Sequence, residues 1–212
     1  MANDQLQITI YELRKLHSQS KQVIQKRLQE FTKVKPSEYF YELAYCLLTP
    51  QTKAESAGKA IEVLKKKDFQ YNDLPLETIL HSKDYYIRFH NTKAKHLCAL
   101  KENFQKHFAA ITNGNSPYEL REYLVKNVLG MGYKESSHFL RNIGKRNLAI
   151  IDRHILKGLL RCGVLKSLPK TLSRKTYLEI EKQFQKFSEE INIPMDELDL
   201  LFWSMVTGEI LK

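Results

Sequence analysis

Two glycines, a lysine and an aspartate in residues 128–154 are the side chains of this chain best suited to chemistry. The segment reads VLGMGYKESSHFLRNIGKRNLAIIDRH, with Gly130 and Gly132 on either side of one apolar residue and Lys134 shortly after them. A neutral lysine amine is a strong nucleophile, but a lysine with an ordinary pKa of about 10.4 is almost entirely protonated at neutral pH. Burial and a nearby helix N-terminus both disfavour the ammonium form. A lysine at the start of a helix, as expected for Lys134, is therefore suited to nucleophilic attack.

The carboxylate of Asp152 has two interpretations. Asp152 follows the apolar run LAII and precedes RHILKGLL, which is the position of an N-cap residue before a helix. The same carboxylate could instead point into a cleft beside Lys134 and assist it. Lys134 has a plainer interpretation too, as an exposed lysine that aids solubility. The residues alone leave these alternatives open.

Glycine spacing around Lys134 predicts a helical hairpin. A helix that starts at Pro117 should stop at Leu129 and Gly130, with Gly130 as a left-handed cap. Gly132 lets the backbone approach another molecule closely because it has no Cβ. A second helix should then run to Gly144. The free amides of its first turn would form an anion site suited to a DNA phosphate. A plain αα-hairpin with glycine caps is the alternative.

The rest of the chain predicts an all-α protein. Apolar residues recur at helical spacing in SEYFYELAYCLL and in RKTYLEIEKQFQKFSEEI. Ser116 and Glu119 form a capping box around Pro117, and the other prolines stand at plausible helix boundaries. No stretch alternates with period two, so we expect about ten helices and no sheet.

Composition restricts the partners and the compartment. The chain of 212 residues has a formal net charge of +10, which suits a polyanion such as nucleic acid. Its three cysteines are far apart, and its seven histidines form no HExxH motif, so we expect no zinc site and no catalytic metal. No signal peptide and no membrane span is evident. These features predict a cytoplasmic protein without a membrane role.

Three stretches together resemble a known family. GMGYKESSHFLRN followed by IDRHIL is similar to the signature of the helix-hairpin-helix DNA glycosylases, which carry a glycine hairpin, a catalytic lysine and a later aspartate. With the ending LFWSMVTGEILK, the chain resembles the archaeal-type 8-oxoguanine DNA glycosylase/lyases, a group also found in some bacteria. The resemblance extends over most of the chain. The four-cysteine iron–sulfur motif of the endonuclease III branch is absent from the sequence.

The resemblance implies an activity for the residues of the hairpin. Lys134 would attack the sugar carbon of a flipped nucleotide, displace 8-oxoguanine and form a Schiff base that permits β-elimination. Asp152 would orient the amine and stabilise the developing positive charge. Amides around Gly130, Gly132 and Tyr133 would hold a backbone phosphate, with a monovalent cation at the hairpin and no other cofactor. The implied partner is double-stranded DNA that contains 8-oxoguanine, bound by a monomer associated with the nucleoid of a prokaryote.

The resemblance also assigns the base pocket and the loop that fills the gap. Trp203 would stack on the flipped base, with Phe89 on the other face and Asp199 on the same helix face as Trp203. Lys212, the last residue, would contact the oxidised purine. Gln51, in LLTPQTK, would enter the space that the flipped base leaves. Core packing is the alternative for both aromatic residues, and an ordinary helix start is the alternative for Gln51.

Two helical domains should flank a DNA-binding cleft in this family, with the hairpin at their border. We expect residues 35–130 to form a central helical barrel, and residues 1–34 plus 131–212 to form the second domain. Two other functions stay open from the sequence. One is a glycosylase/lyase for another oxidised base, and the other is a non-catalytic helix-hairpin-helix DNA-binding module.

Overall fold

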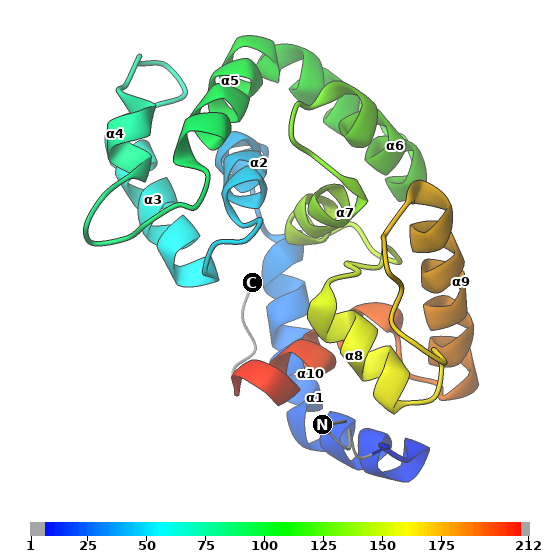
Figure 1. Cartoon of the computed structure of the whole chain (residues 1–212). Coiled ribbons are helices and arrows are strands. Elements are labelled where there is room, and N and C mark those ends of the chain that lie inside the picture. The colour runs from blue at the N-terminus through cyan, green and yellow to red at the C-terminus, as the bar shows by residue number, and fades with distance from the viewer. Residues whose placement is uncertain (1–6, 209–212) are drawn as a thin grey trace. The chain divides into compact units, whose positions relative to one another are not determined.

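The structure is a computed structural model that describes residues 7–208, and every regular element within this range is a helix (Figure 1). The elements are α1 (Ile10–Thr32), η1 (Pro36–Glu38), α2 (Tyr39–Leu48), α3 (Ala54–Lys66), α4 (Leu76–Leu80), α5 (His90–Thr112), α6 (Pro117–Asn127), α7 (Tyr133–Asn142), α8 (Arg153–Arg161), α9 (Arg174–Glu190) and α10 (Met195–Thr207). The predicted all-α fold and the helix count are confirmed for the described part of the chain.

The chain divides into two compact units, residues 34–143 and residues 1–33 with 144–212. The first division falls one residue from the boundary expected at 34/35. The second falls after residue 143 instead of after residue 130. Helix α7 accounts for this difference, because it packs on α2 and α6. Both helices of the hairpin therefore belong to the unit of residues 34–143.

The unit of residues 34–143 is built around α2. This helix packs on α3, α5 and α7, and its sequence YFYELAYCLL is buried on nearly all sides. The ring of Phe40 contacts those of Phe69 and Phe104 at centroid distances of 5.7 and 5.1 Å. Each such buried ring stabilises the fold by about 1.5–3 kcal/mol relative to an exposed one. Helix α7, which carries Tyr133 and Lys134, thus shares the core around α2 with α5.

The unit of residues 1–33 and 144–212 is built around α10. This helix packs on α1, α8 and α9. The approach of α8 depends on Gly158, because a Cβ there would lie 2.7 Å from the ring of Phe202. On the α1 side, His17 Nε2 lies 2.5 Å from Glu197 Oε2 in a buried pair. These contacts hold α8 and α10 in place. Asp152 is the N-cap of α8, and Trp203 lies near the C-terminal end of α10.

The capping box predicted for α6 is confirmed. Ser116 Oγ accepts from the amide of Glu119, the carboxylate of Glu119 accepts from the amide of Ser116, and Pro117 is the first helical residue. The helix ends at Asn127, two residues before the expected stop at Leu129. Val128 already has extended dihedral angles, with φ −102° and ψ 113°.

Candidate functional site

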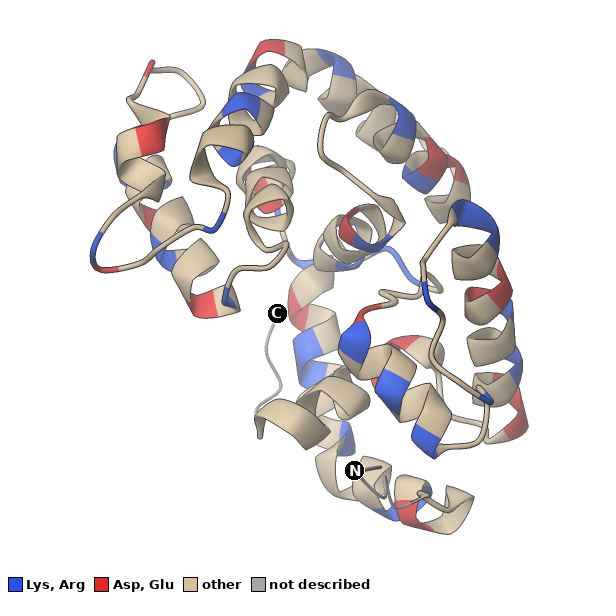
Figure 2. Ribbon diagram, in the orientation of Figure 1, with Lys and Arg blue, Asp and Glu red and all other residues tan. Residues whose placement is uncertain are grey.

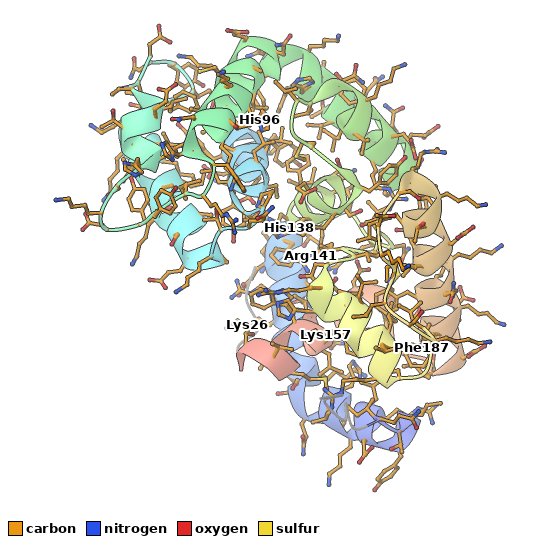
Figure 3. The ribbon with its side chains drawn as sticks, viewed as in Figure 1. Lys26, His96, His138, Arg141, Lys157 and Phe187 are labelled. Carbon is orange, nitrogen blue, oxygen red and sulfur yellow. The ribbon has the colours of Figure 1, made fainter. Side chains whose placement is uncertain are left out.

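Gly130 has the predicted left-handed backbone, but it lies in the turn between α6 and α7 and not at the end of α6. The amide of Met131 donates to the carbonyl of Val128 at 3.1 Å, and Gly130 has φ +87° inside this turn. The left-handed conformation of Gly130 is confirmed, although the residue lies in the turn and does not cap α6. A Cβ on Gly130 would lie 2.2 Å from Nδ1 of His96, a side chain of α5 (Figure 3). Both its φ and its neighbour thus require glycine.

Gly132 is the N-cap of α7 and leaves the first turn of that helix without a side-chain cap. A Cβ at Gly132 would lie 2.9 Å from Oε2 of Glu135, so the Glu135 side chain folds back over the helix start. Tyr133, the first residue of α7, donates its hydroxyl to both carboxylate oxygens of Glu122 in α6, at 2.7 and 2.8 Å. The side chain of Tyr133 therefore joins the two helices of the hairpin. The N-terminal amides of α7, which have no side-chain cap, suit an anion.

Lys134 lies in the first turn of α7 with a partly buried side chain, 29% exposed. Its Nζ is 3.5 Å from Oε1 of Glu135, whose side chain is 15% exposed. A lysine that served only solubility would extend into water, so its partial burial supports a chemical role. Glu135 is the carboxylate that the same helix turn brings to the amine.

A second lysine, Lys93 of α5, is buried, with 4% exposure. Its ammonium donates to the carbonyl oxygens of Leu48 and Pro50, both at 2.7 Å, and to Oγ1 of Thr52 at 2.9 Å. Burial and, to a smaller extent, the charge of Lys134 lower the pKa of Lys93 to about 8, and Glu135 opposes this shift. Lys93 thus connects the loop after α2 to the surroundings of Lys134.

Gln51 and Phe89 share an unusual backbone conformation. Five described residues other than glycine have positive φ, and three of them are Asp or Asn, which tolerate it best. The other two are Gln51, with φ +55°, and Phe89, with φ +60°. Gln51 is exposed, and Phe89 is 50% exposed at the N-cap of α5, with the Arg88 guanidinium 5.0 Å from its ring. The exposure of Phe89 argues against core packing, and strained backbone of this kind concentrates at functional sites.

Asp152 is the N-cap of α8, so one of its two interpretations is confirmed. Its Oδ1 accepts from the amides of His154 at 2.7 Å and Ile155 at 2.9 Å. Both bonds use the same oxygen, so the second oxygen is available to another group. The cap therefore fixes the orientation of the carboxylate through Oδ1 and leaves Oδ2 without a capping bond.

The extended segment before Asp152 is held by two side chains of α9. Tyr177 donates its hydroxyl to the carbonyl of Ala149 and accepts from the amide of Ile151 at 3.2 Å. Glu181, one turn later, accepts from the amide of Ala149 at 2.8 Å. The apolar run LAII is thus a buried connection anchored from the side, and Asp152 stands at its end.

Trp203 and Asp199 belong to α10, and they differ in exposure. The indole of Trp203 is partly exposed and contacts the ring of His154 at 5.8 Å, with 66° between the planes. Asp199 is buried, with 5% exposure. Lys212, the proposed contact to the oxidised purine, lies outside the described residues. Trp203 is therefore accessible for stacking, whereas Asp199 is buried.

Four residues around the candidate groups were missed from the sequence: Lys93, Glu135, Tyr177 and Glu181. One of them carries a signal. Lys93 is in register with Leu97, Leu100 and Phe104, which form the buried stripe of α5, so a lysine interrupts an apolar face. A charge at such a position is buried only with partners. Nothing in the local sequence indicates the other three.

Basic residues recur along α8, as Figure 2 shows. Arg153 and Lys157 are exposed and Arg161 is partly exposed, and their i, i+4 spacing puts them on one face. Ile155 and Leu159 are buried on the opposite side. Lys157 is labelled in Figure 3. This face follows directly after Asp152.

In the part of the chain that the structure describes, no helix is both long and apolar enough to cross a membrane. Within the same residues, no three His, Cys, Asp or Glu side chains group together as metal ligands would.

Comparisons with known proteins agree on one family. Residues 24–193 match the family model described as 8-oxoguanine DNA glycosylase. A relative named 8-oxoguanine DNA glycosylase/AP lyase from Fusobacterium nucleatum is 42% identical over 95% of this chain and 96% of its own length. A relative of the same name from Methanocaldococcus jannaschii is 39% identical over 92% and 95%.

Solved structures give the same result. The crystal structure of the Methanocaldococcus jannaschii 8-oxoguanine glycosylase/lyase in complex with a 15-mer DNA containing 8-oxoguanine is similar with a TM-score of 0.83 and 37% identity. The match covers 96% of this chain and 99% of that chain. The 8-oxoguanine DNA glycosylase of Thermotoga maritima matches with a TM-score of 0.84 and 30% identity, over 96% and 98%. This chain therefore belongs to the 8-oxoguanine DNA glycosylase family.

Proposed function

We propose that this protein is a bifunctional glycosylase/lyase of base excision repair, which excises 8-oxoguanine from double-stranded DNA and then nicks the strand. Its membership of the family and the full-length relatives named 8-oxoguanine DNA glycosylase/AP lyase support this proposal. The single observation that carries the chemistry is Lys134, a partly buried amine in the first turn of α7 directly behind the glycine turn.

DNA binding would use two sets of groups that contact backbone phosphates and are therefore independent of base sequence. The amides at Gly130, Gly132 and Tyr133 would hold one phosphate, since α7 lacks a side-chain cap. The basic face of α8 would neutralise others. A monovalent cation would lie at the hairpin, as the family resemblance implies, and no other cofactor is proposed. The charge of the cation would help to hold the phosphate.

Excision requires the damaged nucleotide to leave the base stack, which costs a few kcal/mol. Gln51 would occupy the space that the base leaves. Trp203 and Phe89 would stack on the flipped base, and the exposed ring area of each supports this role. Asp199 and Lys212 would contribute polar contacts to the purine.

The reaction would begin with the neutral amine of Lys134. Its lone pair bonds to C1′ of the sugar while the C1′–N9 bond breaks, and the base leaves with that electron pair and takes up a proton. Loss of the amine protons and opening of the sugar ring give the Schiff base. Removal of a C2′ proton then breaks the C3′–O bond and nicks the strand on the 3′ side. Asp152 would stabilise positive charge on the sugar and assist the proton transfers.

Borohydride trapping tests this proposal. Sodium borohydride reduces a Schiff base, so wild-type protein should form a covalent adduct with a duplex that contains 8-oxoguanine, and Lys134→Gln should form none. A panel of other lesions tests the alternative of another oxidised base, which predicts a stronger adduct with that lesion. A non-catalytic DNA-binding module predicts DNA affinity without any adduct.

We also propose that the protein acts as a monomer on the chromosomal DNA of a prokaryote. All the groups invoked above come from one chain, and the matched relatives come from bacteria and archaea. Light scattering of the protein with and without DNA should give the mass of one chain; a dimer would contradict this part of the proposal.

A further inference from the structure

The loop after α2 is held by a single side chain from α5. The loop contains Gln51, and its own backbone supplies one turn bond, from the amide of Thr52 to the carbonyl of Thr49 at 3.0 Å. The ammonium of Lys93 adds three bonds, to the carbonyl oxygens of Leu48 and Pro50 and to Oγ1 of Thr52. An ammonium has three donors, so every donor of Lys93 is used on this loop.

These bonds compensate for two costs in the loop. Leu48 is the last residue of α2, and the last carbonyls of a helix have no intrahelical partner and carry partial negative charge. Lys93 supplies a cation there from a position 45 residues away in the chain. The second cost is the left-handed backbone of Gln51, at φ +55°. The bonds to Pro50 and Thr52 lie on either side of Gln51, so they hold this conformation in place.

Lys93 is also a neighbour of the reactive amine. Lys134 and Glu135 are near enough for their charges to change its protonation, and all three residues belong to the unit of residues 34–143. The side chain that orders the Gln51 loop is therefore electrostatically coupled to the residue that would attack the sugar. A displacement of the loop would move Gln51 relative to Lys134.

We propose that Lys93 is a positioning residue for base excision: its ammonium holds residues 49–52 in the one conformation that presents Gln51 to duplex DNA. This inference rests on the proposed function of Lys134 and Gln51. It predicts that Lys93 matters for the step in which the base leaves the stack, and much less for strand nicking once the base is gone. Nicking at an abasic site needs Lys134 and no gap-filling at a paired base.

Two substrates separate these steps. Single-turnover rates should be measured on a duplex with 8-oxoguanine and on the same duplex with a preformed abasic site. Lys93→Met should lower excision by about tenfold to a hundredfold, because a small displacement of a positioned group has effects of this size. Nicking of the abasic duplex should change by less than about threefold. A merely structural residue would lower both rates equally, and that result would contradict the inference.

Coupling to Gln51 gives an independent readout. If Lys93 acts through the loop, Gln51→Ala alone should lower excision, and the double variant should be no slower than the slower single variant. Effects that multiply would contradict the inference. Lys93→Arg keeps a cation with several donors and should recover part of the excision rate that Lys93→Met loses.

A milder pair of variants covers the case in which Lys93→Met does not fold. Thr52→Val removes one of the three acceptors with little change in shape, and Thr52→Ser keeps the hydroxyl as the matched control. Thr52→Val should show the same selective loss of excision to a smaller extent, and Thr52→Ser should resemble wild type. Equal rates for Thr52→Val and Thr52→Ser would argue against the inference.

Wild-type protein distinguishes the two proposals. If wild type excises 8-oxoguanine while Lys93→Met excises it equally fast, only the inference about Lys93 fails. If wild type neither excises the base nor forms the borohydride adduct, the proposed function fails, and the inference that rests on it fails too.

Discussion

The ring of His154 contacts the edge of Trp203 at a centroid distance of 5.8 Å, while the amide of His154 donates to Oδ1 of Asp152. One residue thus joins the candidate stacking ring on α10 to the candidate carboxylate at the start of α8. The relationship lies entirely within the unit of residues 1–33 and 144–212.

Trp203 is the only tryptophan in the chain, so its fluorescence reports on this site alone. Duplex DNA with 8-oxoguanine should quench the fluorescence of Lys134→Gln protein, which cannot turn over, more strongly than DNA with guanine. Trp203→Ala should weaken binding to the lesion duplex by about 5- to 150-fold, since stacking of one base contributes about 1–3 kcal/mol. Equal quenching by both duplexes would argue against a stacking role.

The two roles of Asp152 can be separated by substitution. Asn is as good an N-cap as Asp, so Asp152→Asn should change the free energy of unfolding by less than about 1 kcal/mol. Excision should nevertheless fall strongly, because the charge is gone, while DNA binding persists. Asp152→Ala should lose about 1 kcal/mol of stability as well. Chemical denaturation and single-turnover kinetics give the two quantities, and normal excision by Asp152→Asn would leave only the capping role.

Gly130 should tolerate no side chain. Gly130→Ala is expected to destabilise the protein by about 2 kcal/mol or more, because a left-handed residue with a Cβ is strained and the Cβ would overlap the His96 ring. Gly114→Ala is the matched control, since Gly114 has φ +76° and nothing within 4 Å of an added Cβ. It should lose only about 1 kcal/mol.

His96→Ala should recover part of the loss in the Gly130→Ala background, because it removes the overlap and leaves the backbone strain. Thermal unfolding of Gly130→Ala, Gly114→Ala and the double variant Gly130→Ala/His96→Ala, each compared with wild type, measures both contributions. Equal losses for Gly130→Ala and Gly114→Ala would mean that His96 moves aside at no cost.

Because Gln51 has a left-handed backbone, substituting it with glycine should raise stability and lower activity. Gln51→Gly should raise the free energy of unfolding by about 0.5–1 kcal/mol, because glycine adopts positive φ without strain. It should lower excision from duplex DNA, because the side-chain amide that we propose to fill the gap is lost. Gln51→Asn keeps an amide and tolerates this backbone, so it should retain more activity than Gln51→Ala. A faster Gln51→Gly enzyme would contradict the role of this side chain.

The basic face of α8 should be visible in the salt dependence of DNA binding. Lys157→Ala should reduce the slope of log K against log salt by about 0.9, the value for one released counterion, with similar effects on damaged and undamaged duplexes. Lys175→Ala is the control, because this exposed lysine of α9 lies 4.0 Å from Glu179 and outside the proposed site. Fluorescence anisotropy at several salt concentrations measures both slopes, and equal slopes would exclude Lys157 from the interface.

Features encoded by neighbouring residues could be predicted from the sequence. The helix period, the capping box at Ser116 and the glycine requirement at 130 all depend on residues close together in the chain, and all three are confirmed. The resemblance to the glycosylase family also came from short continuous segments, and the family is confirmed.

Features that depend on distant packing could not be predicted in the same way. Helix α7 belongs to the unit of residues 34–143 because it packs on α2 and α6, and the glycine spacing from which a boundary after residue 130 was expected carries no information on that packing. The partners of Lys93 lie more than 40 residues away. Left-handed backbone at Gln51 and Phe89 is not a preference of either residue type and exists because the surrounding structure imposes it.

The anchoring of residues 149–151 by Tyr177 and Glu181 has a consequence for how the enzyme responds to heat. The amides of Ala149 and Ile151 are bonded to side chains of another helix and belong to buried residues, so their hydrogens can exchange with solvent only when α9 separates from this segment. Asp152 is therefore tied to a cooperative block and not to a fraying loop. On warming, we expect the carboxylate to keep its place until that block opens, so that loss of activity should coincide with melting.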